Sequence, residues 1–385
     1  MQMSKFAAVV IGYNRIPGML RLLESLENAD YGKDELTLII SLDNCGRPEP
    51  EEAARAFQWS HGEKIVRTFP ERQGLRNHIL SCGEFLNEYD AIAVLEDDII
   101  VSPAFYQYMK QAAACYKDNT DIAGISLYSH KMNVNVDLPF VPEPDEYDVF
   151  FMQFAQSWGQ IWMKKQWFAF RDWYHAHSEE PIAADNVPAF VANWPKTSWL
   201  KYHIKYCISE NKYFVYPYQA LTTCFSDAGE HSKETNTVYQ VPLVRKASKT
   251  YRFCEQIEDG VCYDAFFERT GLGKYLDIEE QELCTDIYGL KENKEDKRYW
   301  LTREVKNYQI LKRFDLCMRP QECNVIYGIE GECMFLYDTS VEKSVSKTIK
   351  DKNYLTVNYY YNLNARWKLL QGYFITKIKR KLEKK

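Results

Sequence analysis

The first half of the chain alternates short apolar runs with segments of helical spacing. The runs at 6–13 and 36–43 are continuous, apolar and rich in strand-forming residues, which predicts two buried strands. Residues 17–27 begin with proline and carry leucines three and four positions apart, which predicts a helix. Such alternation indicates a mostly parallel sheet flanked by helices, an α/β fold. Further strands are expected at 64–69, 91–97 and 122–128, and a further helix at 75–87.

The pattern changes in the second half. Residues 133–148 hold three prolines and predict a long loop. Residues 323–338 suggest a hairpin around Glu330-Gly331. We expect three parts: a main domain at 1–250, a smaller mixed α+β region at 251–365, and a basic amphipathic tail at 366–385.

An acidic triplet, Glu96-Asp97-Asp98, interrupts two apolar stretches in AIAVLEDDIIV. Burying an unpaired carboxylate costs several kcal/mol, so the triplet belongs outside the core. Ser102-Pro103 predicts the start of the next helix, with the serine as N-cap. The triplet is therefore expected where a central strand leaves its sheet, at the edge where α/β proteins bind ligands. Taken alone, it also fits a solvated turn.

Other polar groups follow the ends of neighbouring strands. Together they offer planar groups for a base, a carboxylate for ribose, cations for phosphate and carboxylates for a metal. This combination predicts a nucleotide-sugar site. Its expected members are Tyr13, Asn14, Arg15, Asp43, Arg76, Asn77, His78, Glu96 and Asp97, with Asp98 beside them.

This pattern resembles the glycosyltransferases of GT-A (Rossmann-like) fold, whose DxD-type metal motif corresponds to EDD here. VLEDDIIVSPAFYQYM is similar to a segment of the N-acetylglucosaminyltransferase I family. The resemblance spans residues 5–235 and implies transfer of a sugar from a UDP-sugar. It further implies that Asp98 holds Mn²⁺ or Mg²⁺ on the diphosphate and that Asp97 contacts the sugar. Asp43 would face the uridine, and Arg76 with Asn77 or His78 would lie near the nucleotide.

Two further segments carry weaker similarities. NWPKTSW (193–199) is similar to a segment of the same family, and TTCFSDAGEHS (222–232) resembles a glycine-rich loop of bacterial transferases. The second likeness implies that His231 completes the metal shell or contacts the diphosphate. Trp158 and Trp199 are candidates for an acceptor cleft, because sugar C–H faces stack on indole rings. Core packing is the alternative for both.

The general base is not evident. Inverting transfer needs a base near the acceptor hydroxyl. The resembled family has an Asp just after the tryptophan of this segment, whereas here Trp199 precedes Leu200-Lys201. We expect inversion with a relocated carboxylate, ranking Asp185 first and Asp227 second. The remaining acidic alternatives are Glu179 and Glu180.

Composition and charge indicate which class of protein the chain belongs to and where in the cell it is expected. A net charge of −6 argues against a nucleic-acid binder. Eleven cysteines without a Cys-x-x-Cys pair suit free thiols in a reducing compartment, and the apolar run at 6–12 is too short to span a membrane. Residues 366–385 hold eight Lys or Arg against one Glu, with Trp367, Leu370, Phe374, Ile378 and Leu382 at helical spacing. These features predict a cytoplasmic protein, either soluble or peripheral on the inner face of the cell membrane and bound to anionic lipid through the tail.

The expected acceptor is a glycan or lipid-linked glycan in surface polysaccharide synthesis. Two other classes remain open. A sugar nucleotidyltransferase would share the fold and the metal carboxylates, but IGYNRIPG lacks the glycine-rich basic loop expected at its N-terminus. A catalytically inactive sugar- or nucleotide-binding module would explain the missing base.

Overall fold

The computed structural model describes residues 5–182, 186–225, 237–246, 249–294, 296–344, 352–361 and 363–383. The chain divides into two compact units. Unit 1 comprises residues 1–135 and 140–271, and unit 2 comprises 136–139 and 272–385. The boundary predicted at 250 therefore lies inside unit 1, because a short strand at 262–263 joins the main sheet.

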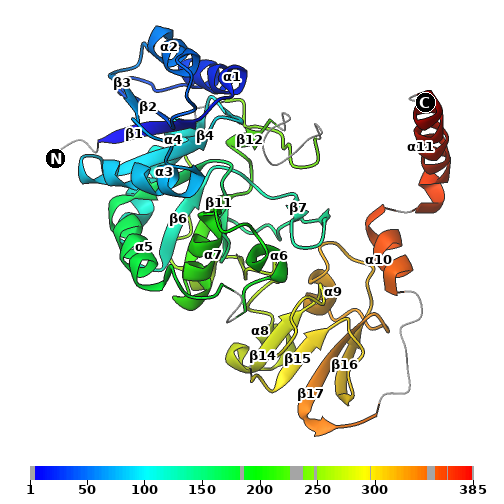
Figure 1. Ribbon diagram of the computed structural model, residues 1–385. Helices are drawn as coiled ribbons and strands as arrows, with labels where there is room; N and C mark the ends of the chain where they lie inside the picture. Colours follow the sequence, from blue (N-terminus) through cyan, green and yellow to red (C-terminus); the bar gives the residue numbers. More distant parts are fainter. Residues whose placement is uncertain are drawn as a thin grey trace. The chain divides into compact units, whose positions relative to one another are not determined.

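Unit 1 is built on a nine-stranded sheet with helices packed against it (Figure 1). The strand order is β13-β9-β11-β6-β10-β4-β1-β2-β3, in which β4, β1, β2 and β3 run parallel and β10 runs antiparallel to β4. The nine strands are β1 (Phe6–Gly12), β2 (Thr37–Leu42), β3 (Lys64–Thr68), β4 (Ala91–Glu96), β6 (Ile122–Ser126), β9 (Val149–Met152), β10 (Gln160–Met163), β11 (Tyr213–Pro217) and β13 (Cys262–Tyr263).

The described residues of unit 1 include seven α-helices. They are α1 (Ile16–Glu27), α2 (Glu49–Ala56), α3 (Leu75–Cys82), α4 (Phe105–Tyr116), α5 (Lys164–His177), α6 (Ala189–Ala192) and α7 (Leu200–Ser209), with 3₁₀ turns at Gly83–Asn87 and Ile257–Asp259. Short strands β5 (Ile99–Val101) and β12 (Thr222–Cys224) pair with each other outside the main sheet, and β7 covers Met132–Asn133. The predicted α/β class, with a mostly parallel sheet flanked by helices and a smaller mixed C-terminal region, is confirmed.

The apolar runs form the core of unit 1. Every residue of β1 is buried, and α1 packs Met19, Leu22, Leu23 and Leu26 onto the sheet. Burying one such side chain stabilises the fold by about 1.5–3 kcal/mol relative to exposure. The helix predicted from Ser102-Pro103 begins later, at Phe105, although the Ser102 hydroxyl still accepts the Ala104 N–H at 3.0 Å.

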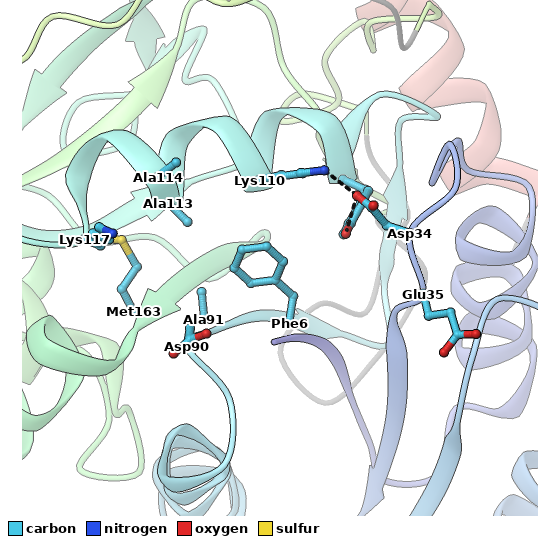
Figure 2. A pocket seen from close by; sticks show the side chains of 11 residues that line it. Phe6, Asp34, Glu35, Asp90, Ala91, Lys110, Ala113, Ala114, Lys117 and Met163 are labelled. Atoms are coloured by element: carbon cyan, nitrogen blue, oxygen red, sulfur yellow. Dashed lines mark hydrogen bonds and ion pairs between the residues drawn. The ribbon is translucent and has the colours of Figure 1, made fainter. Parts of the chain in front are cut away.

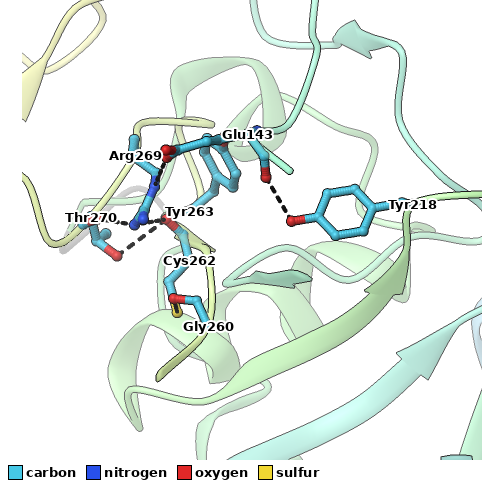
Figure 3. Close-up of polar contacts among 7 residues, drawn as sticks. All are labelled: Glu143, Tyr218, Gly260, Cys262, Tyr263, Arg269 and Thr270. Atoms are coloured by element: carbon cyan, nitrogen blue, oxygen red, sulfur yellow. Dashed lines mark hydrogen bonds and ion pairs between the residues drawn. The ribbon is translucent and has the colours of Figure 1, made fainter. Parts of the chain in front are cut away.

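Within the long loop expected at 133–148, Glu143 is held by Arg269 and two tyrosines (Figure 3). Arg269, which is 7% exposed, donates to the Glu143 carboxylate at 3.0 Å. Tyr218 donates its hydroxyl proton to the Glu143 carbonyl at 2.6 Å, and the Tyr263 hydroxyl accepts the Glu143 N–H at 2.8 Å. The loop is thereby tied to the ends of β11 and β13.

Unit 2 contains a mixed sheet of order β14-β15-β17-β16. Its elements are β8 (Leu138–Pro139), α8 (Gly273–Leu276), a 3₁₀ turn (Glu280–Glu282), β14 (Leu283–Asp286), β15 (Tyr299–Thr302), β16 (Tyr308–Phe314), α9 (Cys323–Ile326), β17 (Met334–Glu342), α10 (Lys352–Tyr361) and α11 (Leu363–Glu383).

The hairpin predicted at 323–338 is wrong. Residues 323–326 form α9, and β17 pairs with β15 and β16 instead. The Asn324 side chain explains the difference, because its oxygen accepts the N–H groups of Cys317 and Met318 at 2.9 Å each and fixes a turn there.

The basic tail forms the helix α11. Trp367, Phe374, Ile378 and Leu382 are each between 58% and 69% exposed along it. None of the helices that the structure describes is both long and apolar enough to cross a membrane.

Candidate functional site

Three neighbouring parallel strands, β4, β1 and β2, end at one edge of the main sheet (Figure 1). Glu96 closes β4 and pairs with Ile11, while Gly12 closes β1 and pairs with Leu42. Residues that follow these positions therefore emerge side by side. This edge carries Tyr13, Asn14, Arg15, Asp43 and the acidic triplet.

Arg15 bridges the two aspartates of the turn between β4 and β5. Its guanidinium donates to the carboxylate of Asp97 and, at 3.2 Å, to that of Asp98. The backbone N–H of Tyr13 also donates to Asp97. Asp97 is 4% exposed, whereas the Asp98 side chain is 27% exposed. Asp98 is therefore the member of the pair that solvent can reach.

One arginine does not neutralise the whole triplet. Burial raises the pKa of Asp97 to about 6, against the opposing charge of Arg15. Burial, and then the charges of Asp98 and Asp97, also raises the pKa of Glu96. The pKa of Arg15 is raised as well: burial works against its charge, but the two aspartates outweigh that effect. The turn thus keeps a surplus of negative charge that favours a second cation.

Helix α1 begins directly after Arg15 and lies against the acidic turn. A Cβ atom built on Gly18 would stand 2.6 Å from the carbonyl oxygen of Asp97, which only glycine avoids. In the sequence, Pro17-Gly18 signals only a helix start, so this close approach could not be predicted. The unpaired N–H groups of the first turn add positive potential near the site.

Asp43 holds the turn that leads into α3. Its carboxylate accepts the backbone N–H groups of Gln73 at 2.7 Å and Gly74 at 2.9 Å. The residue predicted to face a uridine base therefore has a structural role at the same edge, and it is 7% exposed.

The three residues predicted at the start of α3 have different surroundings. His78 is 2% exposed, shares a 2.6 Å hydrogen bond with the Ser41 hydroxyl, and has its pKa lowered to about 4 by burial and then by Arg67. It therefore lies in the core as a neutral ring, out of reach of a ligand. Arg76 binds the Tyr174 hydroxyl at 2.6 Å, and Asn77 is exposed.

Trp158 lies beside the acidic turn because β10 runs antiparallel to β4. Its half-buried indole packs against Tyr128 and Tyr239, with ring centroids 4.8 and 5.2 Å away. The preceding loop is fixed by Gln156, whose side-chain oxygen accepts the Trp158 N–H at 2.5 Å. Gly159 follows with φ +100, and a Cβ there would meet Thr222 at 2.8 Å. The sequence did not identify Gln156 and Gly159, since nothing in it shows which strand β10 joins.

Trp199, the other predicted acceptor contact, lies in the core. It is 3% exposed and packs against Trp162 with ring centroids 5.7 Å apart. Of the two readings left open for this residue, the structure favours core packing, because its indole fills the space between β10 and α7. The other predicted residues, Asp185, Asp227 and His231, lie outside the described residues.

The residues at this edge fit a divalent cation bound by few protein ligands. No group of three or more His, Cys, Asp or Glu able to hold a metal occurs in the described ranges. Mg²⁺ and Mn²⁺ in nucleotide sites take one or two carboxylates and complete their shell with phosphate and water. The exposed Asp98 carboxylate, beside residual negative charge, offers such a ligand.

A cavity of about 290 Å³ lies at the opposite end of the strands (Figure 2). Phe6 and Ala91, the first residues of β1 and β4, form part of its lining, and Lys110 pairs with Asp34 at 2.6 Å at its rim. Parallel sheets bind ligands at the carboxyl ends of their strands, so this cavity is not the candidate site.

Comparisons with known proteins found similar solved structures at low sequence identity. No family model and no curated protein matches the chain. One similar structure is the mannosyltransferase PcManGT from Pyrobaculum calidifontis in complex with GDP-Man and Mn²⁺, at 13% identity and TM-score 0.30, covering 42% of this chain and 45% of that one. S. aureus TarS 1-349 in complex with UDP-GlcNAc matches at 15% identity and TM-score 0.37, covering 59% and 60%. The chain thus spans less than two thirds of each, and the likeness to N-acetylglucosaminyltransferase I remains one of sequence.

Proposed function

We propose that the chain is a glycosyltransferase that moves a sugar from a UDP-sugar, with Mn²⁺ or Mg²⁺, to a glycan or lipid-linked glycan acceptor in surface polysaccharide synthesis. One observation carries the proposal: the Asp97-Asp98 turn, bridged by Arg15, lies at the carboxyl ends of parallel strands. This arrangement joins a solvent-accessible carboxylate to a cation and a helix start, the groups that a sugar diphosphate requires.

Each residue has a separate part in this proposal. Asp98 would hold the metal, which supplies charge neutralisation for the departing diphosphate. Asp97, held by Arg15 and the Tyr13 N–H, would accept a sugar hydroxyl. Trp158, packed against Tyr239, would present an aromatic face to the acceptor. Transfer would invert the anomeric centre, with Asp185 or, second, Asp227 as base.

A panel of nucleotide sugars tests this function. The protein is incubated with each donor, Mn²⁺ and a glycan or lipid-linked glycan acceptor, and the released nucleotide is measured. Release that requires acceptor supports a transferase. Binding of a nucleotide sugar without release would instead indicate an inactive binding module. In a separate assay, formation of a nucleotide sugar and pyrophosphate from a sugar 1-phosphate and a nucleoside triphosphate would indicate a nucleotidyltransferase.

Asp118→Ala is the matched control for substitution of the proposed metal ligand Asp98 by alanine in the same assay. Asp118 is an exposed carboxylate just after α4 whose side chain has no hydrogen bond or ion pair within the described ranges. The variant should release nucleotide at the wild-type rate.

A further inference from the structure

A cluster of three cations lies where the starts of α3 and α7 meet. Arg76, the second residue of α3, donates from Nη1 to the Lys196 carbonyl at 3.4 Å, and its guanidinium carbon lies 4.4 Å from the centre of the Tyr202 ring. The Lys201 ammonium lies 5.6 Å from the same ring centre and donates to the Trp194 carbonyl at 3.2 Å. Arg76, Lys196 and Lys201 are called the cationic cluster below.

The cationic cluster has no carboxylate to balance it in the part of the chain that the structure describes. Lys201 is only 5% exposed, and a buried ammonium with one carbonyl partner loses several kcal/mol of hydration without an equivalent return. Burial, and then the charges of Arg76 and Lys196, lowers the pKa of Lys201. The site would therefore be more stable with an anion in it.

Lys205, one helical turn further along α7, shows how a buried lysine is usually satisfied. It is equally buried, at 5% exposure, and its ammonium pairs with the Glu180 carboxylate at 3.2 Å and with the Pro181 carbonyl at 3.1 Å. The contrast between the two lysines is that Lys201 has no anionic partner among the described residues, whereas Lys205 has one.

We propose that Arg76, Lys196 and Lys201 bind a phosphate group. A phosphate carries up to two negative charges and several acceptor oxygens, which matches a guanidinium and two ammonium groups better than a single carboxylate does. The proposal rests on the proposed function for its two sources: the diphosphate of the donor, or a phosphate carried by the acceptor. The cluster is joined to the donor edge through Gly74, whose N–H binds Asp43 two residues before Arg76.

Titration with inorganic phosphate, followed by ³¹P NMR or calorimetry at constant ionic strength, tests the site without turnover. Lys201→Met keeps the length of the buried side chain, and Lys196→Gln changes only an exposed one. We expect Lys201→Met to weaken phosphate binding about tenfold or more and Lys196→Gln about threefold, because each removes one of the charged donors. Lys205→Met, which removes an already paired lysine, should bind phosphate as the wild type does.

Thermal unfolding gives an independent readout. Without phosphate, Lys201→Met should melt at a higher temperature than the wild type, since it removes an uncompensated buried charge. No measurable phosphate binding, or equal binding by Lys201→Met and Lys196→Gln and the wild type, would overturn the proposal.

Competition with UDP identifies the source. If the donor diphosphate occupies the cluster, phosphate and UDP compete and Lys201→Met weakens UDP binding. If the acceptor supplies the phosphate, both ligands bind together and UDP affinity is unchanged. Phosphate binding without nucleotide release from any donor would leave this site standing and count against the transferase.

Discussion

Gly18 lies so close to Asp97 that a Cβ atom on the glycine would stand 2.6 Å from the aspartate's carbonyl oxygen. Gly18→Ala must therefore displace the acidic turn, because the obstructing atom belongs to the backbone and cannot rotate away. Displacements of about 1 Å can cost a hundredfold in rate, so we expect nucleotide release to fall about tenfold to a hundredfold.

Gly372→Ala is the control for that substitution. Nothing lies within 4 Å of a Cβ built on Gly372, so alanine there should leave the rate unchanged and should not destabilise α11. A Gly18→Ala enzyme with the wild-type rate would show that the turn does not need its present position.

Asp98→Ala should reduce nucleotide release about a thousandfold. Stabilisation of a leaving group by a metal contributes several kcal/mol, and each 1.36 kcal/mol corresponds to about a factor of ten in rate. Chelation of divalent cations should reduce the wild-type rate to a similar level, and added Mn²⁺ should restore the wild type but not the variant. Near-normal turnover of Asp98→Ala would remove this residue as the metal ligand.

The contribution of three buried histidines to the stability of unit 1 should fall with pH below about 6.5, the ordinary pKa of histidine. Burial lowers the pKa of His78 to about 4 and those of His130 and His203 to about 3. The unfolded chain takes up protons near pH 6.5 while the folded chain does not. The stability present above pH 6.5 is therefore lost as the pH falls toward the folded values, at about 4 kcal/mol for the three residues by pH 5.5.

Urea unfolding of the wild type and of His203→Phe at pH 7.5 and pH 5.5 isolates the share of one histidine. Glu96 and Asp97, whose pKa values are raised, gain stability as the pH falls but do so equally in both proteins. His203 stacks on Phe170 with ring centroids 4.0 Å apart, so His203→Phe keeps an aromatic ring in place. The loss between the two pH values should be about 1.4 kcal/mol smaller in the variant, because one proton-binding group has been removed from the unfolded state. An identical pH dependence would show that the pKa of His203 is the same in the folded and the unfolded protein.

The helix α11 should bind anionic membranes. Trp367, Phe374 and Ile378 are exposed on it, and basic residues follow them in sequence. Deleting residues 366–385 should abolish co-sedimentation with vesicles containing phosphatidylserine or phosphatidylglycerol and leave nucleotide release intact. The undeleted protein should not sediment with neutral phosphatidylcholine vesicles. Equal sedimentation of the truncated and full chains with anionic vesicles would refute the tail as the membrane contact.

Asp185→Asn tests the base predicted from the sequence, a residue outside the described part of the structure. A general base contributes about a hundredfold to ten-thousandfold, so the variant should lose a rate factor in that range while its UDP affinity is unchanged. An unimpaired variant would shift attention to Asp227. NMR of the anomeric linkage in the product checks inversion separately, and retention of the donor configuration would contradict it.

The sequence predicted those features that depend on local pattern. The continuous apolar run at 6–13 predicted β1, and the acidic triplet at 96–98 predicted the end of β4. Both strands lie where the sequence placed them. It could not predict which strands become neighbours, and so the contacts of β10 and its preceding loop were missed. All eleven cysteines are free, as the absence of paired spacing indicated.

The burial of individual side chains was equally hard to predict. His78 and Trp199 carry groups suited to ligand binding, but both lie in the core because neighbouring elements cover them. Nothing in the composition of the two segments signals that covering. In the sequence, Lys201 drew notice only because Leu200-Lys201 stands where the resembled family has an Asp. Its burial and its lack of an anionic partner among the described residues became visible through its contacts with Trp194 and Tyr202.

In the proposed function, the direction of β10 places the acceptor contact on a different segment of the chain from the donor contacts. Because β10 runs antiparallel to β4, the loop before its first residue lies at the acidic edge. Trp158 belongs to this loop, which contains none of the proposed donor-binding residues. Phe154, Ala155 and Gln156 of that loop are buried, whereas the Trp158 side chain is half-buried. For the transferase that we propose, substitution of Trp158 alone should therefore change acceptor preference and leave donor affinity unchanged.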